Sequence, residues 1–190
     1  VGSATLPSDR QGELYHRYML GLYRVLEAIV SSHPHILFES CSGGGGRFDP
    51  GMLHYMPQTW TSDNTDALAR IDIQYGTSIC YPYSSMGAHV SAVPNHQVRR
   101  TTPISFRGNV AIPGQFGYEL DLTKLSDEDI AEIKEQTKFY EKYGEVFHRG
   151  DLYRLRNPLG DYMSAIEFVS EDKNTVIVML YSHKGTANAV

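Results

Sequence analysis

Four consecutive glycines at residues 43–46 restrict the fold of this chain more than any other feature of its sequence. They follow a short apolar run, ILFES at 36–40, with Cys41 and Ser42 in between. Each glycine weakens a helix or strand interior by roughly 0.5–1 kcal/mol relative to alanine, so such a run is either a flexible linker or backbone that bends sharply and approaches another group closely. The apolar run of strand length before the glycines predicts a turn at the carboxyl end of a strand.

Strand-length and helical segments alternate along most of the chain. Amphipathic spacing and the positions of proline and glycine predict helices over 8–32, from about 64 and over 126–143, strands at 36–40, 58–62, 76–81 and 103–112, and a long irregular connection over 82–103. Ser8 and Ser126 are the candidate N-caps, and Gly144 is a plausible end of the third helix. Strands that alternate with helices indicate an α/β fold with a mainly parallel sheet.

Residues 151–181 change character and indicate a second module. The runs LYRL, YMSAIEFV and TVIVMLY are strand-like, and SEDKN forms a turn between the last two. We therefore expect an α/β domain over 1–149 and the beginning of a β domain over 150–190.

The composition excludes several classes of partner. A formal charge of -5, with Arg99-Arg100 as the only adjacent basic pair, argues against nucleic-acid binding. There is no apolar run of about 18 residues and no signal-peptide pattern, so we expect no membrane partner and a cytoplasmic location. Cys41 and Cys80 lack the CxxC or CxxH spacing of zinc ligands, and we expect both to be reduced.

Asp63 is the strongest single candidate for chemistry. It lies in the motif SDN directly after the strand-like run QTWTS, where a carboxyl group can be held rigidly. The alternative is a cap for the helix that follows, although Asn64 or Asp66 could also serve as that cap. If the strands before the glycines and before Asp63 are neighbouring strands of a barrel, both loops lie at its catalytic face.

For two other candidate residues, Cys41 and Trp60, the sequence is compatible with two roles each. Cys41 is either a nucleophile or a strand-end thiol used for packing or ligand contact, and Trp60 is either a platform for the C–H face of a sugar or part of the core. The glycines lack the GK[ST] or GxGxxG pattern of phosphate loops. His89 and His96 have no standard metal-ligand spacing, so we expect neither a metal ion nor a cofactor.

Three long motifs, in this order along the chain, are similar to those of a known enzyme family: FESCSGGGGRFDPGML, TWTSDNTDALARIDIQYGTS and YPYSSMGAHVSAVPNHQVRRTTPISFRGNVAIPGQFGYELDL. Over residues 8 to about 150 the chain resembles the α-galactosidases of glycoside hydrolase family 36. The resemblance implies a partial (β/α)8 TIM barrel, about strands 5 to 8, followed by the start of an antiparallel β-sandwich. It also implies hydrolysis of galactoside oligosaccharides of the melibiose and raffinose type, with retention of anomeric configuration.

The resemblance assigns roles to particular residues. It makes Asp63 the general acid/base and places galactose binding on Cys41, Ser42, Gly43 and Gly44, and less directly on Trp60 and Arg47. The family nucleophile, an aspartate in a KWDMN-like motif, has no counterpart here and would precede Val1. The chain thus resembles the second half of an enzyme, and we expect it to be inactive without the missing N-terminal half.

Two alternatives and two further expectations accompany this hypothesis. The alternatives are galactosyl transfer, as in raffinose and stachyose synthases, and a sugar-binding module without catalysis. Half a barrel would leave two strand edges and an apolar interior uncovered, both association hazards. The resemblance also implies a homo-oligomeric parent protein, with a tetramer as one possibility.

Overall fold

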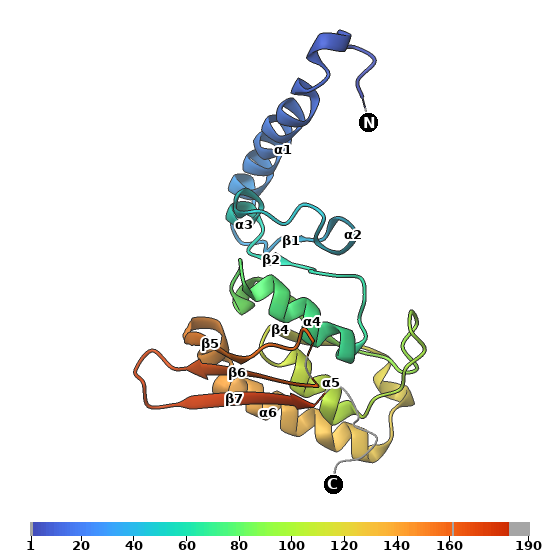
Figure 1. Ribbon diagram of the computed structural model, residues 1–190, viewed down its shortest axis with the longest axis vertical. Helices are drawn as coiled ribbons and strands as arrows, with labels where there is room; N and C mark the ends of the chain where they lie inside the picture. Colours follow the sequence, from blue (N-terminus) through green and yellow to red (C-terminus); the bar gives the residue numbers. More distant parts are fainter. Residues whose placement is uncertain (1, 161, 183–190) are drawn as a thin grey trace.

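The computed structural model describes residues 2–160 and 162–182 of the chain. In chain order the elements are η1 Ser8–Arg10, α1 Glu13–Ser32, β1 Glu39–Ser40, α2 Ser42–Gly45, α3 Pro50–Tyr55, β2 Gln58–Thr59, α4 Ala67–Ser78, η2 Tyr83–Ser85, β3 Gly87–Ser91, α5 Ile104–Ala111, β4 Gln115–Glu119, η3 Leu122–Lys124, α6 Asp127–Arg149, β5 Asp151–Arg156, β6 Met163–Val169 and β7 Val176–Ser182. Figure 1 shows α1 projecting from a larger body that contains α4, α5, α6 and the strands β5–β7. None of the described helices combines the length and the hydropathy needed to span a bilayer.

Four short parallel strands follow one another in chain order. β1 pairs with β2, and β3 pairs with β4 in the register Gly87 to Gln115. A parallel bridge between Thr59 and Met86 joins the two pairs. Since helices lie between these strands, the α/β class expected from the sequence is confirmed.

The main core lies between the helices and the antiparallel sheet β5–β7. Its buried residues come from both parts of the chain: Ala67, Ile71, Tyr83, Met86, Val110, Ile112, Phe147, Ile166, Phe168 and Tyr181. The rings of Phe147 and Phe168 meet edge to face with centroids 5.0 Å apart. The three expected strands of the second module are therefore present, and they pack directly on the helices of the first (Figure 1).

Two predicted strands are helical. Residues 76–78 end α4 and 79–81 form a turn, whereas 104–111 form α5. The β-branched and aromatic residues of both segments suggested strands, but the buried residues of α4 and α5 recur with helical spacing. The expected loop over 82–103 contains β3, whose small residues gave no strand signal.

Helix boundaries also differ at both ends of the chain. α1 begins at Glu13 without a side-chain cap, and Ser8 belongs to the separate turn η1. Ser126 does cap α6, since its Oγ accepts a hydrogen bond of 3.2 Å from the backbone N–H of Asp129. Gly144 does not end that helix, which continues to Arg149, because it lies buried against the Tyr140 ring inside the helix.

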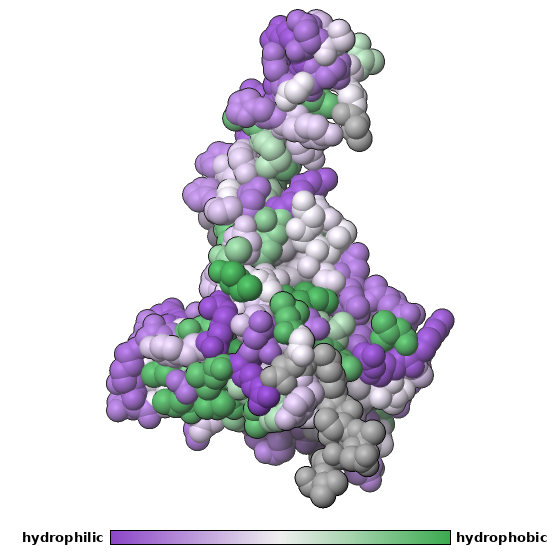
Figure 2. Space-filling view, viewed as in Figure 1, coloured by the Kyte–Doolittle hydropathy of each residue, from purple (hydrophilic) through white to green (hydrophobic). Residues whose placement is uncertain are grey.

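The open face of the parallel strands is polar, contrary to the expected apolar interior. Ala88 and Val90 point to an apolar cluster under α5, so the alternate positions of the four strands face the other way. These positions carry Glu39, Gln58, Gly87, His89, Gln115, Gly117 and Glu119. Exposed apolar residues lie elsewhere, among them several on α1 and, on β7, Val176, Val178 and Leu180, which form a patch (Figure 2).

Candidate active site

The glycines form a left-handed turn at the end of β1. Ser42, Gly43, Gly44 and Gly45 have φ angles of 57, 66, 75 and 90°. The turn closes through a 2.7 Å hydrogen bond from the backbone N–H of Gly45 to the carbonyl of Cys41. L-residues with a side chain lose roughly 1–2 kcal/mol each in this conformation, which explains why glycines occupy it.

The turn packs on the backbone that follows β2. A Cβ on Gly44 would lie 2.8 Å from the backbone nitrogen of Asp63 and 3.0 Å from Cα of Ser62. A Cβ on Gly45 would lie 3.2 Å from the carbonyl oxygen of Thr61, whereas Gly43 has nothing within 4 Å of that position. The structure thus brings the glycine turn and Asp63 together, as the topology predicts. Gly43 is the glycine with open space beside it.

Asp63 is exposed at the point where these two loops meet. Within the described part of the chain, its carboxylate makes no hydrogen bond or ion pair. The cap of α4 is Asp66, whose Oδ2 accepts a 3.1 Å hydrogen bond from the backbone N–H of Ala69. The structure therefore removes the capping alternative for Asp63.

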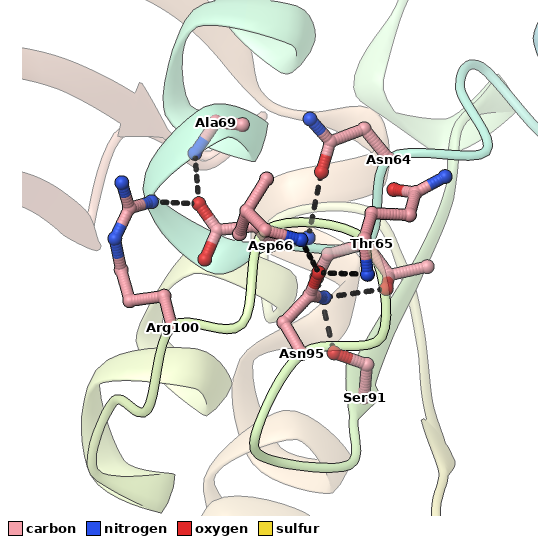
Figure 3. A network of polar contacts seen from close by, with 9 residues as sticks. Asn64, Thr65, Asp66, Ala69, Ser91, Asn95 and Arg100 are labelled. Atoms are coloured by element: carbon pink, nitrogen blue, oxygen red, sulfur yellow. Dashed lines mark hydrogen bonds and ion pairs between the residues drawn. The ribbon is translucent and has the colours of Figure 1, made fainter.

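A polar network fixes the backbone after Asp63 (Figure 3). Asp66 is 3% exposed and pairs with Arg100, while Asn64 Oδ1 accepts a 3.1 Å hydrogen bond from the backbone N–H of Asp66. β3 and the loop after it supply two more contacts: Ser91 Oγ, at the end of β3, donates to the Thr65 carbonyl at 3.1 Å, and Asn95 Nδ2 donates to Thr65 Oγ1 at 2.9 Å. Because Asp66 and Asn95 are buried, a move of this loop would leave their polar groups unpaired in the interior, which stabilises the observed arrangement.

Trp60 lies among polar neighbours and belongs to neither apolar cluster. Its ring stacks on the His89 ring with centroids 4.8 Å apart, and Cζ of Arg70 lies 4.6 Å from the ring centroid. His89 lies on β3, with Nδ1 3.8 Å from Oε2 of Glu119. From the sequence we expect His89 to lie in a loop, with polar packing or substrate contact as its role, whereas the structure places it on β3. The sequence contains no signal for Arg70.

Cys41, Ser42 and Arg47 line one side of a cavity of about 240 Å³ below α1 and α3, which Trp60 and Asp63 do not reach. Arg47 Nη1 donates a 2.6 Å hydrogen bond to Ser42 Oγ, which ties the guanidinium to the glycine turn. Cys41 and Cys80 are both free and exposed. A larger cavity of about 750 Å³ lies between α6 and β7, and none of the predicted site residues lines it.

The described residues hold no cluster of three His, Cys, Asp or Glu side chains that could bind a metal ion. The candidate site brings together an exposed carboxyl group, a left-handed glycine turn and an aromatic ring. Exposed amides and hydroxyls of this kind suit a neutral, hydroxyl-rich ligand, and the ring suits its C–H face.

Comparison with known proteins gives consistent results. The family model Melibiase matches residues 1–150. α-Galactosidase AgaA of Geobacillus stearothermophilus is 57% identical over 100% of this chain and 26% of its own length. α-Galactosidase 1 of Pediococcus pentosaceus is 52% identical over 96% of this chain and 25% of its own length. The chain thus spans about a quarter of the length of the curated relatives it matches.

Solved structures agree with the sequence comparison. The crystal structure of AgaA, described as a GH36 α-galactosidase, has a TM-score of 0.93 to this chain at 57% identity, covering 100% of the chain and 26% of AgaA. The α-galactosidase from Lactobacillus brevis has a TM-score of 0.92 at 46% identity, covering 99% and 26%. Variants of AgaA have been solved in complex with raffinose and with stachyose. The chain belongs to the melibiase family, and it is similar to one segment of the glycoside hydrolase family 36 α-galactosidases.

Proposed function

We propose that the full-length protein carrying this chain is a retaining α-galactosidase with Asp63 as its general acid/base. The observation that carries the proposal is the exposed Asp63 carboxylate, which has no partner among the described residues and lies on a loop held by buried hydrogen bonds. A carboxylate that only contacts solvent does not need a rigidly held loop. A proton donor does, because it has to keep one position relative to the leaving oxygen. The names of the relatives, all α-galactosidases, support the same reaction.

Retention requires two carboxyl groups roughly 5–5.5 Å apart. In the first step Asp63 donates a proton to the glycosidic oxygen while the second carboxylate attacks the anomeric carbon. In the second step Asp63 accepts a proton from the incoming water. The nucleophilic carboxylate is expected from a part of the full-length protein that this chain does not include. This division of roles explains why we propose that the chain alone has no activity.

The four parallel strands, which follow one another in chain order, support the assignment of this region to a (β/α)8 barrel. We take them as about strands 5 to 8 of a (β/α)8 barrel over 1–149, with 150–190 as the start of a β-sandwich. Loops after the strands of such a barrel form its active site. The polar open face of β1–β4 fits this arrangement, because a ligand with many hydroxyl groups needs polar side chains around it.

The glycine turn and its neighbours are the proposed galactose site. Gly43 offers open space beside its backbone, and Gly44 places that backbone against the Asp63 loop. Ser42 Oγ and the Arg47 guanidinium, which are hydrogen bonded to each other, can both contact hydroxyls. Cys41 is exposed beside them, and Trp60 offers the ring on which a sugar packs.

The first prediction concerns the reaction of the full-length protein. Melibiose hydrolysis followed by proton NMR should release α-galactose first, with the β anomer appearing only through mutarotation, because two inversions restore the configuration. Release of β-galactose first would contradict the retaining mechanism. Binding of galactose without turnover would favour the non-catalytic alternative, and faster galactosyl transfer to sucrose than to water would favour the synthase alternative.

A matched prediction concerns the chain alone. The 190-residue polypeptide, refolded and freed of other proteins, should not hydrolyse p-nitrophenyl α-galactoside above the buffer rate. Measurable turnover that disappears in the Asp63→Asn variant would show that the second carboxylate lies within the chain itself.

A further inference from the structure

Arg70 is a buried guanidinium that has no carboxylate partner in the described part of the chain. It lies on α4 and is 3% exposed. Burial lowers the pKa of Arg70 to about 10, so the side chain remains charged at neutral pH. Its neighbours on the buried side of α4 include Ala67 and Ile71, which pack in the apolar core.

A buried charge without a counter-ion is unfavourable for stability. Desolvation of an ion costs several kcal/mol even after the structure relaxes, and well-packed apolar residues at such positions are often as stable or more stable. The packing of α4 therefore does not explain why an arginine occupies this position. Its contacts offer a better explanation.

All three contacts of the Arg70 guanidinium go to the backbone and the ring around the candidate active site. Nη1 donates to the carbonyl of Ser62, the residue before Asp63, at 3.2 Å. Nη2 donates to the carbonyl of Gly87 on β3 at 2.6 Å. The guanidinium carbon Cζ also lies over the Trp60 ring, 4.6 Å from its centroid.

We infer that Arg70 is a positioning residue for Asp63: it ties the end of β2 to β3 and thereby fixes the place of the carboxyl that transfers the proton. This inference rests on the proposed function. The planar guanidinium supplies two directed hydrogen bonds and a flat face at once, whereas a lysine ammonium supplies neither the fixed geometry nor the stacking. A displacement of about 1 Å at a reacting group can lower a rate ~100-fold, so the loss should be visible in catalysis.

Arg107 provides a matched control. It is 5% exposed, lies on α5, and donates from Nη1 to the carbonyl of Ser91 at 2.5 Å and from Nε to the carbonyl of Thr102 at 3.2 Å. Burial lowers its pKa as well. Its hydrogen bonds go to Ser91, the last residue of β3, and to Thr102, and not to residues 60–63. The same substitution thus removes a similar buried group without loosening the Asp63 loop directly.

The test compares Arg70→Lys, Arg70→Met and Arg107→Lys in the full-length protein, using melibiose and dinitrophenyl α-galactoside. Melibiose has a poor leaving group that needs a proton, whereas dinitrophenolate leaves without one. Arg70→Lys should lower kcat/KM on melibiose ~10- to 100-fold and on the aryl galactoside less than about threefold. Arg107→Lys should lower the Tm about as much as Arg70→Lys does. It should lower kcat/KM by the same factor on both substrates. Arg70→Met should show a larger difference than Arg70→Lys between the losses of kcat/KM on the two substrates. If Arg70→Met does not fold, the result for Arg70→Lys alone tests the positioning role.

Equal relative losses on the two substrates in Arg70→Lys, as in Arg107→Lys, would overturn the positioning role, and so would unchanged melibiose hydrolysis. Asp63→Asn, measured in the same series, separates this failure from a failure of the proposed function. If Asp63→Asn loses melibiose hydrolysis while Arg70→Lys shows no difference between substrates, the inference about Arg70 alone is wrong. If Asp63→Asn hydrolyses melibiose normally, the proposed role of Asp63 is wrong.

Discussion

Asp63→Asn in the full-length protein is expected to lower kcat/KM on melibiose by at least ~10³-fold, within the range that general acid–base catalysis contributes. The amide has nearly the same shape as the carboxyl group but cannot donate its proton to the glycosidic oxygen. The Tm should change little, because the Asp63 carboxylate is exposed and makes no hydrogen bond or ion pair with any described residue. Steady-state assays on melibiose together with a thermal melt check both parts.

A substrate whose leaving group needs no proton provides a second test of the role of Asp63. With dinitrophenyl α-galactoside the first step needs no proton, so the enzyme should become galactosylated and then wait for the missing base. A pre-steady-state burst of dinitrophenolate is therefore expected, and azide, which attacks without a base, should restore turnover and yield α-galactosyl azide. Absence of both the burst and the azide product would contradict the acid/base assignment.

Asp72→Asn is the matched control for the loss of one charge. Asp72 is exposed on α4, and it makes no hydrogen bond or ion pair with any other described residue. Its substitution should leave both kcat/KM and the Tm unchanged. Asp66→Asn differs from both, because Asp66 caps α4 and pairs with Arg100, so it should lower the Tm.

The sequence predicts the α/β class and the closeness of the two loops because both depend on local patterns and on topology. Parallel strands place their carboxyl ends at one edge, whatever the lengths of the helices between them. β3 and α5 were missed for a physical reason. Small residues in GAHVS lack strand propensity, and Gly87 is needed there because a Cβ would lie 3.0 Å from the Trp60 ring. Tertiary contact, not local preference, decides such segments.

The same limit applies to the site. Asp63 and the glycines could be found because they stand at strand ends in unusual motifs. Arg70 could not, since an arginine on an amphipathic helix is ordinarily a surface residue, and only the fold shows that it is buried under Trp60. The resemblance places galactose binding on both Gly43 and Gly44, yet the space beside Gly44 is filled by the backbone of residues 62 and 63.

Among the three glycines with left-handed backbone, Gly43, Gly44 and Gly45, substitution by alanine should therefore have the largest effect at Gly44. The new methyl group would lie 2.8 Å from the backbone nitrogen of Asp63, so the loop has to move. Overpacking of this kind costs about 1–3 kcal/mol, and the φ of +75° adds the strain of a left-handed alanine, about 1–2 kcal/mol. The Tm should fall, and kcat on melibiose should fall ~100-fold because Asp63 is displaced.

Gly43→Ala separates these two contributions. Its φ of +66° imposes the same backbone strain, but nothing lies within 4 Å of the added methyl group. The Tm should fall by less than in Gly44→Ala, and kcat should change little. If galactose uses the open space beside Gly43, KM should rise. Equal losses of Tm and kcat in both variants would mean that the left-handed backbone alone requires the glycines. In that case the contact between Gly44 and the Asp63 loop would have no part in placing the carboxyl group.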